Sequence, residues 1–507
     1  MAEIKIDGNT LTIEQAMSIS RGESTASVAA ESKERMTKSR AAVEEIIRSG
    51  DTVYGINTGF GAMSSVRIDD EEIEALQENL VRSHACGVGD KMDPEHVLLM
   101  MVFRANSIAK GVSGARPELV EHILSMVNSR ISPDVPRIGS LGASGDLAPL
   151  SHMALSMMGE GNCSVYTNGS WKHQGSKEAL AKAGLKPIKL RAKEGLSLIN
   201  GTSQMCAYLA STLLNMETLS FAADASLACS LEAIRGSQKP FDPRVHSSRP
   251  QFGQALSAAR VLELLSDSEI SSSDEDYERV QDAYCFRCGP QVHGPVIDLL
   301  RETRRMLEIE INSATDNPLV FTDRDTPEII SGGNFHGQNL ALASDSIAIA
   351  CHELATISER RINQILDPNW SGQNAFLAEK EGLESGLMIV QYVAASIISE
   401  LHLLANPATT SNVPVSMGKE DHVSMGSTGC FRANKSSILL SQAIANELVC
   451  SSEALDRIDG KFGNGVSKIQ KWVRTLVGPL KGDRTLTEEC EKLSKSILNG
   501  ELTDIFG

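Results

Sequence analysis

Aromatic residues are scarce in this chain, and their scarcity limits how its core is built. Phe, Trp and Tyr together make up 4% of the 507 residues, whereas the sequence contains 17 methionines. The core must therefore consist mostly of aliphatic side chains and methionine. Hydrophobic residues account for 41% and charged residues for 22%. These values are typical of a globular protein and exclude a disordered chain.

Lysine and arginine are also in short supply. They number 48 against 65 acidic residues, which gives a formal net charge of −17 at pH 7. A chain with this balance repels phosphate backbones and anionic lipid surfaces. We therefore expect neither nucleic acid nor a membrane surface as a partner.

Long uninterrupted hydrophobic runs are missing. The first residues contain no basic segment followed by an apolar run, so we expect no secretory signal. The most apolar window, residues 386–405, is interrupted by Gln391, Glu400 and His402, which favours a buried helix over a membrane span. We expect a cytoplasmic protein.

Cysteine is too sparse for a disulfide framework, with ten residues spread along the chain. Cys206, Cys229 and Cys351 lie in apolar helical patterns, where free cysteine packs as a small hydrophobe. Cys285 and Cys288 form a C-x-x-C pair, which is compatible with a redox or zinc site. No second pair follows at zinc spacing, so we favour plain packing and expect no metal.

The chain is longer than one compact core usually grows, so we expect two or three packed subregions. We place the division between residues 1–202 and 203–507. At the start, residues 4–8 alternate isoleucine with charge and end in Asp-Gly, which predicts a small hairpin. Thr12 and Gln15 then form a capping box that opens a helix through about Ser20.

Helical periods dominate the remainder. Apolar residues recur every three or four positions from Met205 to Leu231, which predicts one helix of about thirty residues. Its other faces are also apolar, as expected for the middle of a bundle. Similar patterns cover residues 337–366 and 386–404, and two amphipathic helices flank Gly478-Pro479. The acidic run within 266–278 predicts a solvated loop.

These patterns predict a mainly α fold. Its centre is a long antiparallel helix bundle, and a smaller N-terminal region contains short strands.

Residues 139–150 (GSLGASGDLAPL) are the most informative segment for chemistry. Ser144 is not the serine of a nucleophile elbow, because Asp146 stands where that motif requires glycine. Ala143-Ser144-Gly145 can instead condense internally. The Gly145 nitrogen attacks the Ala143 carbonyl, and loss of two waters leaves a methylidene-imidazolone electrophile. Glycine permits the dihedrals and close approach that this ring requires. Alone, the tripeptide is more often an ordinary turn.

Five further motifs in a fixed order change that interpretation. With the Ala-Ser-Gly segment, the chain resembles the aromatic amino acid ammonia-lyases, from about Tyr54 to Gly426. The five motifs are residues 54–61 (YGINTGFG), 195–202 (GLSLINGT), 281–288 (QDAYCFRC, followed by PQV at 290–292), 315–318 (TDNP) and 332–336 (GGNFH).

The resemblance implies a fumarase/aspartase-like architecture and roles in catalysis or binding for residues of several of these motifs. The substrate amine adds to the methylidene-imidazolone formed from Ala143, Ser144 and Gly145, so no external cofactor is needed. Tyr54 is the candidate base at the β-carbon, and its ordinary pKa of about 10 must then be lowered. The guanidinium fork of Arg287 clamps the substrate carboxylate.

The remaining implied roles are supporting ones. Asn200, Gln281 and Tyr284 line and polarise the prosthetic group, while Phe335 forms an apolar wall. For Gln281 and Tyr284, scaffold and catalytic duties stay open alternatives.

Three residues resemble the histidine-type members of the family. His84, in a Ser-His pair, stands where the family varies with substrate. Glu420 replaces the glutamine of phenylalanine and tyrosine lyases, and its carboxylate can hydrogen-bond an imidazole N–H and share proton transfer. Met388 also fits the histidine-type pocket. The resemblance thus implies elimination of ammonia from L-histidine to give trans-urocanate, the first step of histidine degradation.

Two segments depart from the family pattern. Residues 416–419 read SMGK where relatives have Ser-x-Asn-Gln, and Asn406-Pro407 replaces His-Pro. Neither change removes a group that the mechanism needs.

Three alternatives remain open. A tyrosine or phenylalanine lyase or aminomutase of the same family differs only in substrate. A fumarase-like lyase without an internal electrophile would carry a Gly-Ser-Ser-x-Met-Pro loop, which is absent. A helical assembly protein would not need these polar residues. The resemblance also implies a homotetramer whose active sites draw residues from neighbouring subunits, which fits helices with apolar surface on more than one face.

Overall fold

The computed structural model describes residues 1–49, 52–53, 55–58, 67–270, 280–324 and 326–506. The described chain divides into two compact units. Unit 1 comprises residues 1–211, 304–344 and 408–431, and unit 2 comprises residues 212–303, 345–407 and 432–507. Tyr54 and residues 271–279 of the acidic segment lie outside the described residues.

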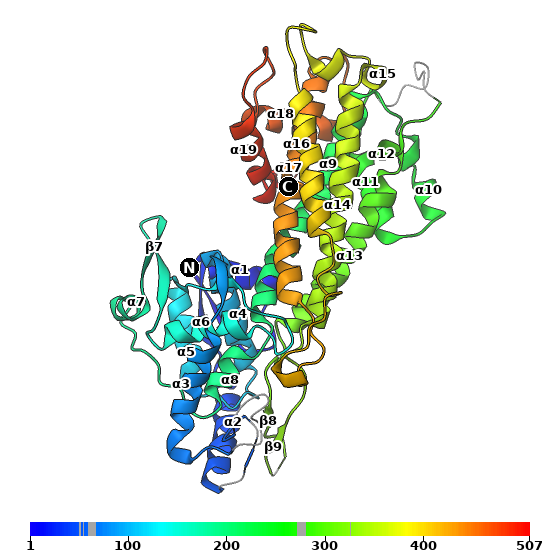
Figure 1. Cartoon of the computed structure of the whole chain (residues 1–507). Helices are drawn as coiled ribbons and strands as arrows, with labels where there is room; N and C mark the ends of the chain where they lie inside the picture. Colours follow the sequence, from blue (N-terminus) through cyan, green and yellow to red (C-terminus); the bar gives the residue numbers. More distant parts are fainter. Residues whose placement is uncertain (50–51, 54, 59–66, 271–279, 325, 507) are drawn as a thin grey trace. The chain divides into compact units, whose positions relative to one another are not determined.

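Unit 1 contains eight complete described helices that differ in length from one to five turns. They are α1 Ile13–Arg21, α2 Ala30–Ser49, α3 Ile73–His84, α4 Pro94–Ala109, α5 Pro117–Asn128, α6 Leu147–Met157, α7 Ser176–Lys182 and α8 Glu194–Ile199. Helix α4 is buried from Val97 to Ala109 and packs against α1 and α5 (Figure 1). The capping box at Thr12 and Gln15 opens α1 as predicted.

All described strands lie in unit 1 and form four small sheets. They are β1 Ala2–Ile6, β2 Ser24–Val28, β3 Val88–Lys91, β4 Ile131–Pro133, β5 Pro136–Ile138, β6 Asn162–Thr167, β7 Ser170–Gly175, β8 Leu319–Phe321 and β9 Glu328–Ile330. The sheets pair β1 with β2, β3 with β5, β8 with β9, and β4, β6 and β7 in that order.

The predicted N-terminal hairpin is wrong. Strand β1 pairs in parallel with β2, and Ala2 lies opposite Ser24. Two parallel strands need a crossover connection, and α1 supplies it between them. The Asp7-Gly8 turn therefore leads into a helix and not into a returning strand.

Four long helices belong partly to each unit, namely α9 Ser203–Ala233, α13 Gly289–Glu310, α14 Gln338–Leu366 and α17 Gly426–Leu455. The first of these confirms the predicted thirty-residue helix. Unit 2 adds α10 Pro243–Ser247, α11 Phe252–Leu264, α12 Tyr284–Arg287, α15 Pro368–Ser371, α16 Met388–Leu404, α18 Asn464–Leu476, α19 Thr487–Leu498 and α20 Glu501–Asp504.

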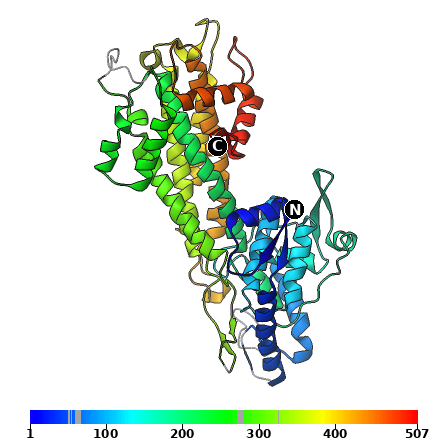
Figure 2. The same cartoon turned by 180° about the vertical axis from the view of Figure 1, so that it is seen from behind.

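Within unit 2 the long helices run side by side, as both views show (Figures 1 and 2). Gln391 near the start of α16 contacts Asn363 near the end of α14. Since His402 near the end of α16 lies against His352 in the middle of α14, the two helices are antiparallel. Helices α9 and α17 run in the same direction, with Asn215 bonded to Ser437 and Ser226 to Glu447. A mainly α fold built around long helices is confirmed.

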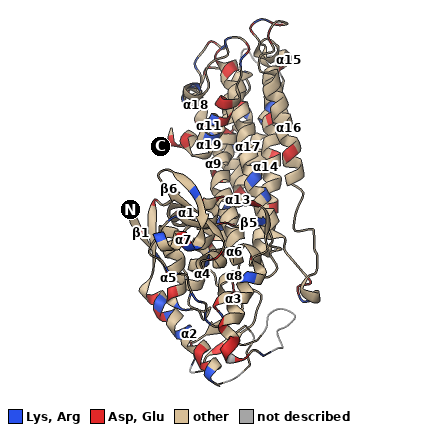
Figure 3. Ribbon diagram, turned by 60° about the vertical axis from the view of Figure 1, so that its left-hand side comes forward, with Lys and Arg blue, Asp and Glu red and all other residues tan. Residues whose placement is uncertain are grey.

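Helices α9 and α16 carry few charged residues, and Figure 3 shows long tan stretches in both. Among the described helices, α14 alone has the length and apolar composition that a membrane-spanning helix needs. Of its most apolar window, 56% is buried inside the protein. A core helix of a bundle has the same properties.

Candidate active site

The Ala-Ser-Gly segment lies in unit 1, in the loop between β5 and α6. Two segments distant in sequence bind the residues just before it. The carbonyl oxygen of Gly142 accepts hydrogen bonds from the Gly337 nitrogen at 3.1 Å and from Ser424 Oγ at 2.9 Å. The Leu141 carbonyl accepts a hydrogen bond from the Met425 nitrogen at 2.8 Å. The loop is therefore fixed through its backbone. The Ser144 hydroxyl makes none of these hydrogen bonds.

The end of the loop is pressed against Gly201. Gly145 and Gly201 form an isolated parallel bridge, and Gly145 has a φ of +73°. A β-carbon on Gly145 would lie 2.2 Å from the Gly201 carbonyl oxygen, so no other residue fits without moving the backbone. The Asp146 nitrogen donates to that same oxygen at 2.7 Å. The packing thus requires glycine at the position where ring closure also requires it.

Asn200 is the predicted site residue that directly contacts the loop. It follows α8, and its Nδ2 donates a hydrogen bond of 2.7 Å to the Ser144 carbonyl oxygen. Its Oδ1 is buried and has no donor among the described residues. A buried amide oxygen without a partner is costly, and an amine N–H from a bound molecule would satisfy it.

Asp146 is a functional candidate that sequence reasoning used only to reject the nucleophile elbow. Its Oδ2 accepts the Gln204 and Met205 nitrogens at the start of α9, at 2.8 and 3.1 Å. Ser140 Oγ, which also contacts the Gly145 carbonyl, donates to Oδ1 at 3.2 Å. Complete burial raises the pKa of Asp146 to about 7, although these bonds and Arg104 lower it. Asp146 therefore links the loop to the N-terminus of α9.

A buried charge cluster behind the loop was also missed. Arg104 of α4 donates to the Asn200 carbonyl oxygen at 2.8 Å. Lys193 forms an ion pair of 3.2 Å with Asp316, and neither side chain has exposed surface. Burial lowers the pKa of both Arg104 and Lys193, and Asp316 opposes the shift. The available signal was one arginine within the apolar run of residues 97–109, because arginine is seldom fully buried without a partner.

The two residues predicted to choose the substrate are electrostatic neighbours. His84 ends α3, and Glu420 lies in a turn closed by a bridge between Val415 and Glu420. Burial lowers the pKa of His84, while the Glu420 carboxylate acts to raise it. Ser83 Oγ lies 3.0 Å from His84 Nδ1, which fixes the ring orientation. The charge of the Glu420 carboxylate therefore reaches the His84 imidazole.

Phe335 precedes α14 in unit 1 and is half-buried. The next residue, His336, stacks on His422 with ring centroids 5.7 Å apart. Since His422 is two residues after Glu420, the Phe335 turn and the Glu420 turn lie together. Sequence reasoning did not single out either histidine.

The remaining predicted site residues belong to unit 2. Tyr284 and Arg287 occupy the single turn of α12, with the guanidinium 4.4 Å from the ring centroid, and Tyr284 is 71% exposed. Gln281 is exposed just before this turn, and Met388 is the half-buried first residue of α16. Unit 2 therefore brings together Tyr284 and Arg287. Tyr54, the candidate base, lies outside the described residues.

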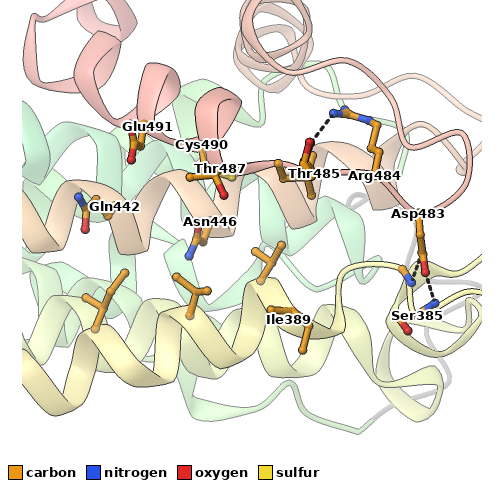
Figure 4. A pocket seen from close by; sticks show the side chains of 15 residues that line it. Ser385, Ile389, Gln442, Asn446, Asp483, Arg484, Thr485, Thr487, Cys490 and Glu491 are labelled. Carbon is orange, nitrogen blue, oxygen red and sulfur yellow. Dashed lines mark hydrogen bonds between the residues drawn. The ribbon is translucent and has the colours of Figure 1, made fainter.

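A pocket of about 520 Å³ also lies in unit 2, between α16, α17 and the segment that leads into α19. Figure 4 shows Ile389 of α16 on one side, with Asn446 and Gln442 of α17 opposite. None of the predicted site residues lines it. Asp483 at its end accepts hydrogen bonds from the Ser385 and Gly386 nitrogens. The pocket is thus separate from the residues that carry the predicted chemistry.

The cysteines are free in the described structure. Cys285 is buried and Cys288 half-buried, and desolvation raises the pKa of Cys285 to about 11. A thiol of this kind is a poor nucleophile. Among the described residues, no three His, Cys, Asp or Glu side chains gather as metal ligands would.

Comparisons with known proteins agree with the motifs. The sequence model of the aromatic amino acid lyases matches residues 11–475. A histidine ammonia-lyase of Myxococcus xanthus is 43% identical over 500 residues, covering 98% of this chain and 97% of that protein.

Solved structures of two different activities resemble the fold. The histidine ammonia-lyase of Trypanosoma cruzi has a TM-score of 0.91 and 36% identity, covering 99% of this chain and 94% of that one. A tyrosine aminomutase from Streptomyces globisporus has a TM-score of 0.92 and 35% identity, covering 100% and 98%. The fold alone therefore does not distinguish the substrates, and the side chains of the site must.

Proposed function

The chain belongs to the aromatic amino acid lyase family, and we propose that it eliminates ammonia from L-histidine to give trans-urocanate. The reaction is the first step of histidine degradation and would take place in the cytoplasm. The relatives support this choice, because the similar protein of Myxococcus xanthus is a histidine ammonia-lyase. The observation that carries the substrate choice is that the Glu420 carboxylate acts on the pKa of His84, since a histidine and a carboxylate can each hydrogen-bond an imidazole.

The residues present fit a methylidene-imidazolone formed from Ala143, Ser144 and Gly145. Gly145 packs against the Gly201 backbone only because Gly145 has no β-carbon. The Ser144 carbonyl, which would stay as the ring carbonyl, already accepts a hydrogen bond from Asn200. When present, this group supplies the electrophile to which the substrate amine adds, so that nitrogen becomes a better leaving group.

The other residues bind the substrate and move its protons. Asn200 Oδ1, buried without a donor, is suited to accept an N–H of the substrate amine. His84 and Glu420 hold the imidazole, and the Glu420 carboxylate accepts a hydrogen bond from its N–H. Tyr54, following the family resemblance, removes the β-hydrogen.

Residues of unit 2 bind the substrate carboxylate. Arg287 clamps the substrate carboxylate with its planar fork, while Tyr284 stacks against the guanidinium. Gln281 lies beside them in the sequence, and Met388 and Phe335 provide apolar walls.

We also propose that the enzyme works as a homotetramer. Four large apolar side chains of α16 are at least 45% exposed, namely Ile389, Tyr392, Val393 and Leu403. An apolar patch of this kind on one helix is typical of a protein interface. A symmetric assembly covers such a patch on every copy and allows Tyr284 and Arg287 to complete the site of a neighbouring subunit.

Turnover of single amino acids tests the function. We expect the purified protein to form a conjugated, ultraviolet-absorbing product faster from L-histidine than from L-tyrosine or L-phenylalanine. Faster turnover of tyrosine would instead favour a lyase or aminomutase of the tyrosine type. The Ser144→Ala variant is the control, since it cannot form the electrophile and should be inactive. Sedimentation that finds an active monomer would contradict the tetramer.

A further inference from the structure

The fully buried Arg104 has no part in the chemistry described above. Its Nη1 donates to the Asn200 carbonyl oxygen at 2.8 Å, and the side chain has no exposed surface. Its Nε and Nη2 are buried and lack an acceptor among the described residues. A guanidinium in this state is less favourable for folding than an aliphatic side chain of similar size. Packing alone does not explain why an arginine is present.

Arg104 lies directly behind the backbone that holds the electrophile loop. A β-carbon on Gly201 would be 2.0 Å from Nη1, so the guanidinium is in contact with this glycine. On the opposite side, Gly201 forms the bridge to Gly145 and accepts the Asp146 nitrogen. Asn200, whose carbonyl Arg104 binds, donates to the Ser144 carbonyl. Residues 200–201 therefore connect Arg104 with the last part of the loop.

Charge provides a second connection. Asp146 and Asp316 are the two anions whose charges act on Arg104. Burial raises the pKa of Asp146 to about 7, and Arg104 opposes this shift. Without Arg104 the Asp146 carboxyl would hold its proton to a higher pH. A protonated carboxyl is a weaker acceptor for the Gln204 and Met205 nitrogens that anchor it.

We propose that Arg104 is a positioning residue for ring closure at residues 143–145. It fixes Asn200 and Gly201, and these hold the loop folded back so that the Gly145 nitrogen reaches the Ala143 carbonyl carbon. This inference rests on the proposed function, because it assumes that the ring forms.

Ring closure balances as two dehydrations. The Gly145 nitrogen bonds to the Ala143 carbonyl carbon, and that carbonyl oxygen leaves as water with the amide hydrogens of Ser144 and Gly145. Ser144 then loses Oγ together with its α-hydrogen as a second water. No oxidant or co-reactant is required. The intact mass of the chain therefore reports closure directly, without an activity assay.

The test follows the rate of mass loss in freshly synthesised protein. Wild type, Arg104→Met and Arg104→Lys are made by cell-free synthesis at several pH values. Samples are quenched at intervals, and the mass of the intact chain is measured by mass spectrometry. We expect closure to be about tenfold slower in Arg104→Met, as for loss of one charge-assisted hydrogen bond. The lysine variant should be intermediate. The defect of Arg104→Met should be largest above about pH 7, where the Asp146 carboxyl is ionised in the wild type but keeps its proton in the variant.

Arg40→Met is the matched control. Arg40 is also a buried guanidinium of unit 1 that donates to a backbone carbonyl, that of Ala192 at 2.8 Å. It contacts neither Asn200 nor Gly201 in the described structure. Arg40→Met should lower the melting temperature yet close at the wild-type rate.

Closure of Arg104→Met at the rate of Arg40→Met would overturn the proposal. If Arg104→Met does not fold, wild-type closure in Arg104→Lys would also overturn it. A wild-type chain that never loses two waters would refute the proposed function instead, so the two failures are distinguishable.

Discussion

The side-chain amide of Asn200 joins two parts of the site, because Nδ2 donates to the Ser144 carbonyl at 2.7 Å while Oδ1 remains buried and unpaired among the described residues. One side chain thus holds the loop and offers an acceptor to a substrate amine. We predict that Asn200→Ala lowers kcat/KM for L-histidine by roughly tenfold to a hundredfold, as for loss of one or two buried hydrogen bonds. Steady-state kinetics with histidine measure this effect.

Asn446→Ala is the matched control for Asn200. Asn446 is 4% exposed, its Nδ2 also lacks an acceptor among the described residues, and it lines the unit 2 pocket in Figure 4. Because it has no place in the proposed mechanism, its removal should leave kcat/KM unchanged. Equal losses in the two variants would mean that the effect of Asn200 is only structural.

The pairing of His84 with Glu420 predicts a shift in pH dependence. Burial lowers the pKa of His84, and the Glu420 charge raises it. Replacing Glu420 with glutamine removes the opposing charge, so the pKa of His84 falls further. If His84 must be neutral to bind the other nitrogen of the substrate imidazole, the acid limb of kcat/KM against pH moves to lower pH in Glu420→Gln. The comparison uses normalised profiles, because the variant also loses a substrate contact.

Asp421→Asn tests whether any nearby charge has this effect. Asp421 is exposed and adjacent to Glu420, yet it is not among the charges that act on His84. Its variant should keep the wild-type acid limb. If the acid limb of kcat/KM is unchanged in Glu420→Gln, the titration of His84 does not set that limb.

The sequence predicts the long helices well because their apolar periods extend over many turns. The thirty-residue pattern after Met205 became α9, and the pattern ending at Leu366 became α14. The N-terminal hairpin failed for a different reason. Alternation at residues 4–6 indicates a strand but carries no information on its partner, and α1 brings β2 to that position in parallel.

The site divides in a similar way. Local motifs located the Ala-Ser-Gly loop and Asn200. The two lie together because Gly145 packs closely against Gly201. Arg104 and Lys193 escaped notice, and Asp316 was noted only as part of the 315–318 motif, because the burial of each charge depends on segments distant in sequence. Only the three-dimensional structure places them behind the loop. The roles of all the site residues named from the sequence remain predictions.

The buried carboxyl of Asp146 predicts that stability depends on pH. Its pKa is raised to about 7 from an ordinary 3.8. The folded chain therefore binds a proton that the unfolded chain releases above about pH 4, and this contribution to stability is lost as the pH rises toward 7. Relative to Asp146→Asn, the wild type should lose up to about 4 kcal/mol between pH 4 and pH 8.

The comparison is made between the Ser144→Ala chain and the same chain with Asp146→Asn added. Neither of these chains can form the ring. Unfolding by urea at several pH values gives the free energy of unfolding. Asp421→Asn in the same background should behave as the parent chain at every pH, because the carboxyl it removes is exposed. A stability difference between the parent chain and Asp146→Asn that does not vary with pH would contradict a raised pKa.

Unit 2 depends on a buried ion pair between Arg361 of α14 and Glu447 of α17. Both side chains have no exposed surface, and Arg361 Nη2 donates to Glu447 Oε2 at 2.8 Å. Ser226, Ser230 and Ser358 donate to the same carboxylate. We predict that Arg361→Met lowers the free energy of unfolding by about 3–5 kcal/mol, because it leaves a buried anion without its cation.

The double variant Arg361→Met, Glu447→Leu separates the charge from the packing. An apolar pair of similar volume removes the uncompensated anion, so a large part of the lost stability should return. Denaturant unfolding of both variants measures the difference. If the double variant is no more stable than Arg361→Met, then the serines alone satisfy Glu447. In that case the arginine contributes mainly through the hydrogen bond that its Nη1 donates to the Cys285 carbonyl beside Tyr284.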